Sequence, residues 1–264
     1  MKIEIFGRTE QGCVRENNED AFAVLHLDHP ERKLDPDGRA IDAGRAGTLV
    51  VVCDGMGATG HGDLASEIAC SQFVARVLAD APRLVAGRAP REHVLRAALD
   101  EADTAISNAA ERDPRLRGMG TTLTAALVGP EGVALVHVGD SRGYRFRDGE
   151  LFQVTQDHSV TGQLVAAGRL TAEQAREYPH RDQLLQALGR GVKLAPQQAN
   201  DEFARGDCLM LCSDGLTRMI SDAEICDVLG AQTSSVRACR SLTELACARG
   251  ARDNVTVCIV RRVE

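Results

Sequence analysis

The sequence predicts an α+β fold made of two stacked antiparallel β-sheets with pairs of helices outside them. Two long helical patterns follow three strand patterns with no strand between them, and this order excludes a regular β-α-β alternation. A meander of short strands over residues 118–154 is joined by hairpin turns at 129–132 and 147–150, where glycine permits a positive φ. In such a sandwich, the strand ends that carry aspartate would gather at one edge.

The first half of the chain supplies three strands and the two long helices. The apolar run that begins at Thr48 predicts a buried strand, which stops at Asp54-Gly55. Residues 28–47 are rich in Asp, Arg, Gly and Pro and are expected to form a surface loop or irregular hairpin. The strands are expected at residues 2–7, 21–27 and 48–54, and the amphipathic helices at 63–82 and 92–112.

The second half continues with the meander and then alternates short helices with strands. Two helix starts carry a capping box, Thr171 with Gln174 and Ser221 with Glu224. Two strands near the C-terminal third are expected to form a hairpin with each other. The strands are predicted at 126–128, 133–138, 144–147, 151–154, 197–204, 208–212 and 255–261, and helices at 158–167, after 171, after 221 and around 236–245.

Composition predicts one globular domain over residues 1–264, with 44% hydrophobic and 26% charged residues. The formal net charge is −7 and no basic tract is present, which argues against nucleic-acid binding. The longest apolar stretches reach about seven residues, far below the roughly 20 that span a membrane. Most of the nine cysteines lie in apolar runs, so we expect buried thiols and a cytoplasmic location.

Acidic residues recur at the ends of predicted strands. One Asp-Gly after an apolar run is ordinary turn chemistry, but chance explains five such clusters less easily than one or two. A carboxylate at a strand end, beside a glycine whose carbonyl can turn toward the same ion, suits a hard cation. The clusters are Glu19-Asp20, Asp54-Gly55, Asp140, Asp214-Gly215 and Asp253.

Six short motifs in order resemble the metal-dependent 2C-type Ser/Thr protein phosphatases in their bacterial form. They are residues 15–20 (RENNED), 54–57 (DGMG), 120–122 (GTT), 138–142 (VGDSR), 213–215 (SDG) and 253–256 (DNVT). Each motif alone is weak evidence for the family, but six in the right order over nearly the whole chain are strong evidence. The resemblance implies a four-layer α-β-β-α sandwich, a centre of two Mn²⁺ or Mg²⁺ ions, and hydrolysis of phosphoserine and phosphothreonine by a metal-bridged water.

The resemblance also implies a role for each acidic residue. Asp54 would bridge the two ions, the Gly55 carbonyl would bind one, and Asp214 and Asp253 would complete the other. Three carboxylates against two divalent cations leave a net charge of +1, which attracts a phosphate dianion. Glu19 and Asp20 would hold metal-bound waters, and Asp140 would hold a third ion together with Asp214.

Arg15 would grip the phosphate oxygens with its planar guanidinium. The alternative for Arg15 is an ion pair with Glu19 at the surface. The segment 156–190 corresponds to the family's flap beside the catalytic centre, and Asp157 is expected to cap its first helix.

The sequence departs from the family pattern after Met56. Ala58, Thr59 and Asp63 stand where many bacterial relatives have Gly, His and Glu, and Met56 occupies the eukaryotic position of a general-acid histidine. A metal-bound water is therefore the first candidate for protonating the leaving group. His61 is a second candidate, although a loop histidine is more often only a solvent-facing residue.

Three functions stay open at this point. The first is an active monomeric phosphatase whose partners are phosphoproteins, among them a Ser/Thr kinase and its substrates. The second is a silent binding module, which would be expected to have lost Asp54, Asp214 or Asp253; all three are present. The third is an enzyme for small phosphate esters.

Overall fold

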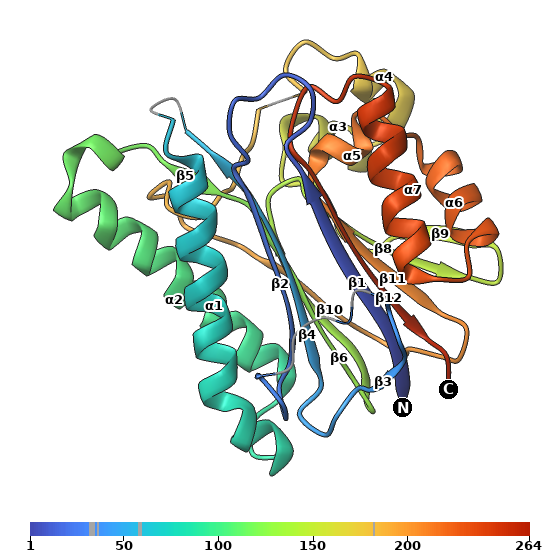
Figure 1. Ribbon diagram of the computed structural model, residues 1–264. Helices are drawn as coiled ribbons and strands as arrows, with labels where there is room; N and C mark the ends of the chain where they lie inside the picture. Colours follow the sequence, from blue (N-terminus) through green and yellow to red (C-terminus); the bar gives the residue numbers. More distant parts are fainter. Residues whose placement is uncertain (32–34, 36, 58–59, 182) are drawn as a thin grey trace.

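Two antiparallel β-sheets stack face to face at the centre of the molecule, and helices cover both outer faces (Figure 1). The computed structural model describes residues 1–31, 35, 37–57, 60–181 and 183–264. The predicted α+β class, with four layers in the order α-β-β-α, is confirmed. Within the described residues, no helix carries an apolar stretch long enough to cross a lipid bilayer.

The first sheet has the strand order β3-β1-β12-β11-β8-β9. Its middle strand, β12, pairs with β1 on one side and β11 on the other, so the N-terminal and C-terminal strands lie together. The strands are β1 (Lys2–Glu10), β3 (Ile41–Asp42), β8 (Arg142–Arg147), β9 (Glu150–Gln153), β11 (Cys208–Cys212) and β12 (Val255–Arg262).

The second sheet has the order β10-β7-β6-β4-β2, and a short strand, β5, extends the pairing of β4. β4 lies inside this sheet, between β2 and β6, which explains its unbroken apolar run. The strands are β2 (Asp20–His26), β4 (Thr48–Met56), β5 (Gly120–Thr121), β6 (Leu123–Gly129), β7 (Gly132–Val138) and β10 (Gln197–Asp201).

Alternate residues of each central strand enter different hydrophobic layers. On β4, Leu49, Val51 and Cys53 face the helices, whereas Val50 and Val52 pack between the two sheets. β11 divides in the same way, because Leu209 and Leu211 meet Val50 and Val52 in the inter-sheet core while its cysteines face the other helices. The strands are thus buried on both faces, which holds their ends in place.

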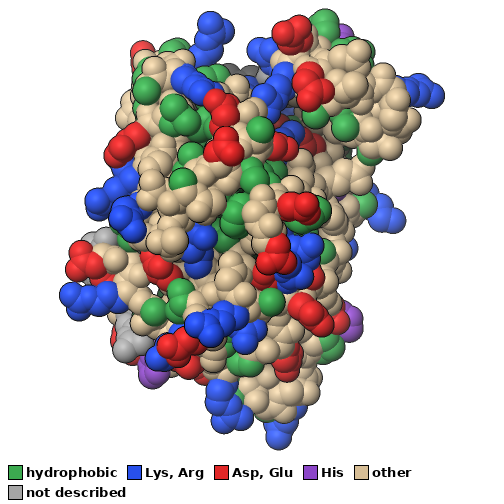
Figure 2. Space-filling view, turned by 90° about the vertical axis from the view of Figure 1, so that its right-hand side faces the viewer, with side chains coloured by type: hydrophobic (Ala, Val, Ile, Leu, Met, Phe, Trp, Pro, Cys, Tyr) green, Lys and Arg blue, Asp and Glu red, His purple; other side chains and the backbone are tan. Residues whose placement is uncertain are grey.

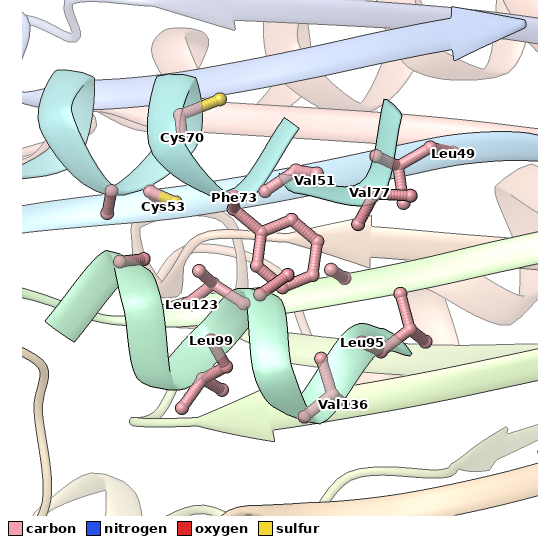
Figure 3. Packing of buried hydrophobic residues seen from close by; sticks show 14 of the residues in the cluster. Leu49, Val51, Cys53, Cys70, Phe73, Val77, Leu95, Leu99, Leu123 and Val136 are labelled. Carbon is pink, nitrogen blue, oxygen red and sulfur yellow. The ribbon is translucent and has the colours of Figure 1, made fainter. Parts of the chain in front are cut away.

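Two long helices cover the second sheet, and three helices cover the first. α1 contributes Phe73, fully buried against Leu95 and Leu99 of α2 and Leu49 of β4 (Figure 3). Burial of a side chain of this size stabilises the fold by about 2–3 kcal/mol. The helices are α1 (Gly62–Val85), α2 (Arg91–Arg112), α3 (Val160–Ala166), α4 (Ala172–Arg176), α5 (Asp214–Thr217), α6 (Asp222–Ala231) and α7 (Ser235–Ala248), with a 3₁₀ turn, η1, at Pro114–Leu116.

Several predicted boundaries differ from the structure, and one predicted pairing is wrong. The segments 197–204 and 208–212 do not form a hairpin, because β10 pairs with β7 in the second sheet and β11 pairs with β8 and β12 in the first. Buried Phe203 lies in the core between the two sheets, where the chain crosses from one to the other. β1 also continues to Glu10, and the predicted loop 28–47 contains the short strand β3.

Candidate active site

The predicted acidic residues lie at one edge of the sandwich, where strands of both sheets end. Asp20 begins β2 and is paired across the ladder with Asp54 near the end of β4. Asp140 follows β7, Asp214 begins α5 directly after β11, and Asp253 precedes β12. This edge is at the top of Figure 1, where the loop after β1 meets the segment before β12.

Asp20 joins the two sheets at this edge. Its Oδ2 accepts hydrogen bonds from the hydroxyls of Ser213, at 2.7 Å, and Thr256, at 2.6 Å. Both donors belong to the first sheet or its connections, whereas Asp20 belongs to the second. The carboxylate is therefore fixed in orientation by the packing of the sandwich.

The backbone around Asp54 is closely supported. Its carbonyl accepts from the Thr121 hydroxyl at 2.8 Å and from the Thr122 amide at 2.9 Å, and its amide donates to the Thr122 hydroxyl at 3.0 Å. These contacts confirm that the two threonines hold the sheet together. A Cβ at Gly55 would lie 2.1 Å from the Gly62 carbonyl, so only glycine fits there.

Asn254 ties the loop after β1 to the start of β12. Its side chain donates to the carbonyls of Gln11 and Asn17, and its Oδ1 accepts from the amide of Glu19 at 2.8 Å. The loop that carries Arg15 and Glu19 is thereby held beside Asp253.

Arg15 is half-exposed and points to this carboxylate. Its Nη2 donates to Asp253 Oδ2 at 2.8 Å, and its Nη1 lies 3.9 Å from Glu19 Oε2. The hydrogen bond to Asp253 raises the pKa of the Arg15 guanidinium. The alternative of an ion pair with Glu19 alone is not what the structure shows.

The carboxylates influence one another electrostatically. The pKa values of Asp54 and Asp140 are raised well above the ordinary value. The largest cause is desolvation by burial, and the second largest is the negative charge of Asp214. Desolvation also raises the pKa of Asp20 to about 7, against the opposing effect of its two hydroxyl donors. Asp253 adds to the repulsion felt by Asp54 and Asp20. The acidic residues therefore form one charged region.

The donor set of this region fits a hard divalent cation. Carboxylate and carbonyl oxygens are the ligands that Mg²⁺ and Mn²⁺ prefer, and a cation would offset the mutual repulsion of the acids. Within the described parts of the chain, however, no three His, Cys, Asp or Glu side chains are already grouped around one ion position. Asp214 instead forms an ion pair of 2.5 Å with Arg218.

Two arginines at this edge were not assigned from the sequence. Arg218 lies four residues after Asp214, a helical spacing that could have indicated the pair. Arg142, on β8, donates from Nη2 to Asp157 Oδ2 at 2.7 Å. The prediction that Asp157 caps the first flap helix is therefore wrong, since Ser159 accepts from the Gly162 amide as the cap of α3.

The segment after Met56 is only partly described. Ala58 and Thr59 lie outside the described residues. Met56 pairs with Gly120 of β5, and His61 occupies the N-cap position of α1 without a side-chain capping hydrogen bond.

Known proteins match this chain over almost its full length. A family model described as protein phosphatase 2C matches residues 36–248. The serine/threonine phosphatase Stp of Listeria welshimeri is 36% identical over 258 residues, which cover 97% of this chain and 94% of the relative.

Solved structures of phosphatases share the fold. The serine/threonine phosphatase PstP of Mycobacterium tuberculosis superposes with a TM-score of 0.83 at 33% identity, over 100% of both chains. The catalytic domain of PstP in complex with two manganese ions gives a TM-score of 0.79 at 32% identity, over 100% of this chain and 99% of that one. The chain therefore belongs to the protein phosphatase 2C family of enzymes.

Proposed function

We propose that this protein hydrolyses phosphoserine and phosphothreonine in other proteins, with two divalent cations, Mn²⁺ or Mg²⁺, as cofactors. The observation that carries the proposal is the gathering of five aspartates from both sheets at one edge, beside an arginine. The similarity to bacterial Ser/Thr phosphatases, one of them solved with two manganese ions, supports the same function.

The resemblance to the family and the shared edge of the sandwich support an assignment of the residues that would hold the cations. Asp54 and the Gly55 carbonyl, at the end of β4, would hold the two ions together with Asp214 and Asp253. Glu19 and Asp20 would hold their waters, and Asp140 would bind a third ion with Asp214. Bound divalent cations would neutralise phosphate charge and lower the pKa of a water molecule, so that it could lose a proton at neutral pH and attack phosphorus.

The protein's own groups would bind and orient the substrate. Arg15 would turn its guanidinium to two phosphate oxygens, a change that its half-exposed position allows. Asp20 would keep its orientation during turnover, because Ser213 and Thr256 both donate to it. Met56 has no titratable proton, so we propose that water rather than a side chain protonates the leaving oxygen.

We propose that residues 1–264 act as a single catalytic domain and as a monomer, on phosphoproteins that include a Ser/Thr kinase and its substrates. All nine cysteines are free thiols, six of them buried, which supports a reducing cytoplasm as the place of action.

Phosphate release from a phosphothreonine peptide tests the function. We expect release with Mn²⁺, loss of release with EDTA, and recovery when Mn²⁺ is added in excess. Release from p-nitrophenyl phosphate but from no phosphopeptide would favour the small-ester alternative. No Mn²⁺-dependent release from either substrate would leave the binding-module alternative and overturn the proposal.

A further inference from the structure

A cavity of about 700 Å³ adjoins the acidic edge. It lies between the flap helices α3 and α4 on one side and α5 on the other, and Asp140, Asp214 and Asp253 line one end of it. A cavity of this size holds a drug-sized ligand or a short peptide segment, so it is larger than a phosphoryl group requires. Figure 2 shows acidic and basic side chains together around the upper end of the neighbouring face.

The cavity has an apolar patch among polar and charged lining residues. Val165 of α3, Ala172 and Ala175 of α4, and Met219 after α5 all line it. Small and flexible apolar side chains leave room for the backbone and an aliphatic side chain of a bound peptide.

The charged residues of the cavity divide into paired and unpaired groups. Arg142 is paired with Asp157 at 2.7 Å, and Arg218 with Asp214 at 2.5 Å. Arg176, at the end of α4, and Arg252, next to Asp253, are exposed, and neither has an ion-pair partner within 4.0 Å among the described residues. Hydrogen bonds, and to a smaller extent the charge of nearby Arg176, lower the pKa of Glu173. Both Glu173 and Arg176 are at the surface, so the two guanidinium groups can turn to an external anion.

We propose that this cavity binds the residues that flank the phosphorylated residue, and that Arg176 and Arg252 select an acidic side chain there. This inference rests on the proposed function, since the phosphate would occupy the acidic edge while the flanking residues extend toward the flap. The net charge of −7 repels acidic peptides at long range. The two arginines beside the site would offset this repulsion locally and attract an acidic side chain. A carboxylate and a second phosphate share this chemistry, and the guanidinium group binds either through paired hydrogen bonds.

The test compares matched phosphothreonine peptides that carry Glu, phosphoserine, Gln or Lys at the flanking positions. We expect kcat/KM for the Glu peptide to exceed that for the Gln peptide by about tenfold. One exposed ion pair contributes roughly fivefold or less, so this factor requires both arginines to contribute. The double variant Arg176→Ala/Arg252→Ala should reduce this ratio to near one. The phosphoserine peptide shows whether phosphate or carboxylate is the better anion.

Arg169→Ala is the matched control, because Arg169 is an exposed arginine of the same flap that does not line the cavity. It should keep the wild-type ratio. Arg252→Glu should shift the preference toward the Lys peptide, a reversal that loss of folding does not produce. In the wild type, raising salt should reduce the ratio, because exposed charges are screened.

Equal kcat/KM for the Glu and Gln peptides in the wild type would overturn the inference, and so would a ratio unchanged in the double variant. Either result, with Mn²⁺-dependent release intact, would leave the proposed function standing. If no phosphopeptide is hydrolysed at all, the proposed function fails, and the inference fails with it.

Discussion

Single residues at the acidic edge are held by contacts from distant parts of the chain. Asp214 stands out, because its charge is the first carboxylate that raises the pKa of both Asp54 and Asp140. It is also nearly buried and forms an ion pair with Arg218. Its charge also raises the pKa of Asp20, so one side chain influences three other acids of the proposed centre.

Asp214→Asn tests this residue's role. The amide keeps the shape of the side chain but removes the negative charge that would bind a cation, so we expect kcat to fall about 100-fold or more. Far-UV circular dichroism should remain unchanged, because the backbone of α5 does not depend on the charge. Asp227→Asn, at an exposed position of α6, is the control and should keep full activity. Near-normal turnover in Asp214→Asn would contradict the assignment.

The acids could be predicted from sequence, whereas their partners could not. Each acid adjoins an apolar run, and this local signal is visible without a structure. Arg142 meets Asp157 fifteen residues away, and Ser213 meets Asp20 at a separation of 193 residues. The second contact depends on how the two sheets stack, and the first on how the chain after β9 returns to β8; neither is encoded in a local pattern.

The same division applies to the secondary-structure elements. Both predicted capping boxes are present, at Thr171 with Gln174 and at Ser221 with Glu224, because a helix cap is decided within four residues. The hairpin predicted for β10 and β11 was wrong, because either strand could pair with several others in a sandwich. Pairing is decided by the core that each strand completes.

Ser221→Ala tests the cap of α6. The Ser221 hydroxyl accepts from the Glu224 amide at 3.3 Å, and Glu224 also forms an ion pair with Arg249 beyond α7. Loss of the hydroxyl should lower the free energy of unfolding by about 1 kcal/mol, measured by urea denaturation with an unchanged m-value. Ser71→Ala, at an exposed position within α1, is the control and should change stability little. Equal effects of the two substitutions would show that the cap contributes nothing specific.

At the scale of the whole molecule, the sandwich concentrates repelling charges at one edge and stabilises them through its core. Packing on both faces of β4 and β11 holds the strand ends together, against the mutual repulsion of the carboxylates at those ends. Buried carboxylates with raised pKa values destabilise the folded state whenever they are ionised. Stability and the proposed function therefore oppose each other at this edge.

The pH dependence of stability follows from the direction of these shifts. A carboxyl group with a raised pKa binds its proton more tightly in the folded state, so its contribution is favourable at low pH and is lost as the pH rises. For Asp20 the window runs from the ordinary value of 3.8 to about 7. Asp140 shifts in the same direction.

Asp140→Asn tests how the negative charge of this side chain affects thermal stability. In EDTA at about pH 8, where more of the negative charge of the cluster is present than at low pH, we expect the Tm of the variant to exceed that of the wild type by about 2–4 °C, which corresponds to roughly 1 kcal/mol. The difference should shrink toward pH 4, because protonation removes the same charge from the wild type.

Added Mn²⁺ should raise the Tm of the wild type more than that of the variant, since a ligand stabilises the state that binds it. Differential scanning calorimetry at both pH values, with Asp227→Asn as control, measures these shifts. A variant with the wild-type Tm in EDTA at pH 8 and an equal response to Mn²⁺ would show that Asp140 belongs neither to the repelling cluster nor to a cation site.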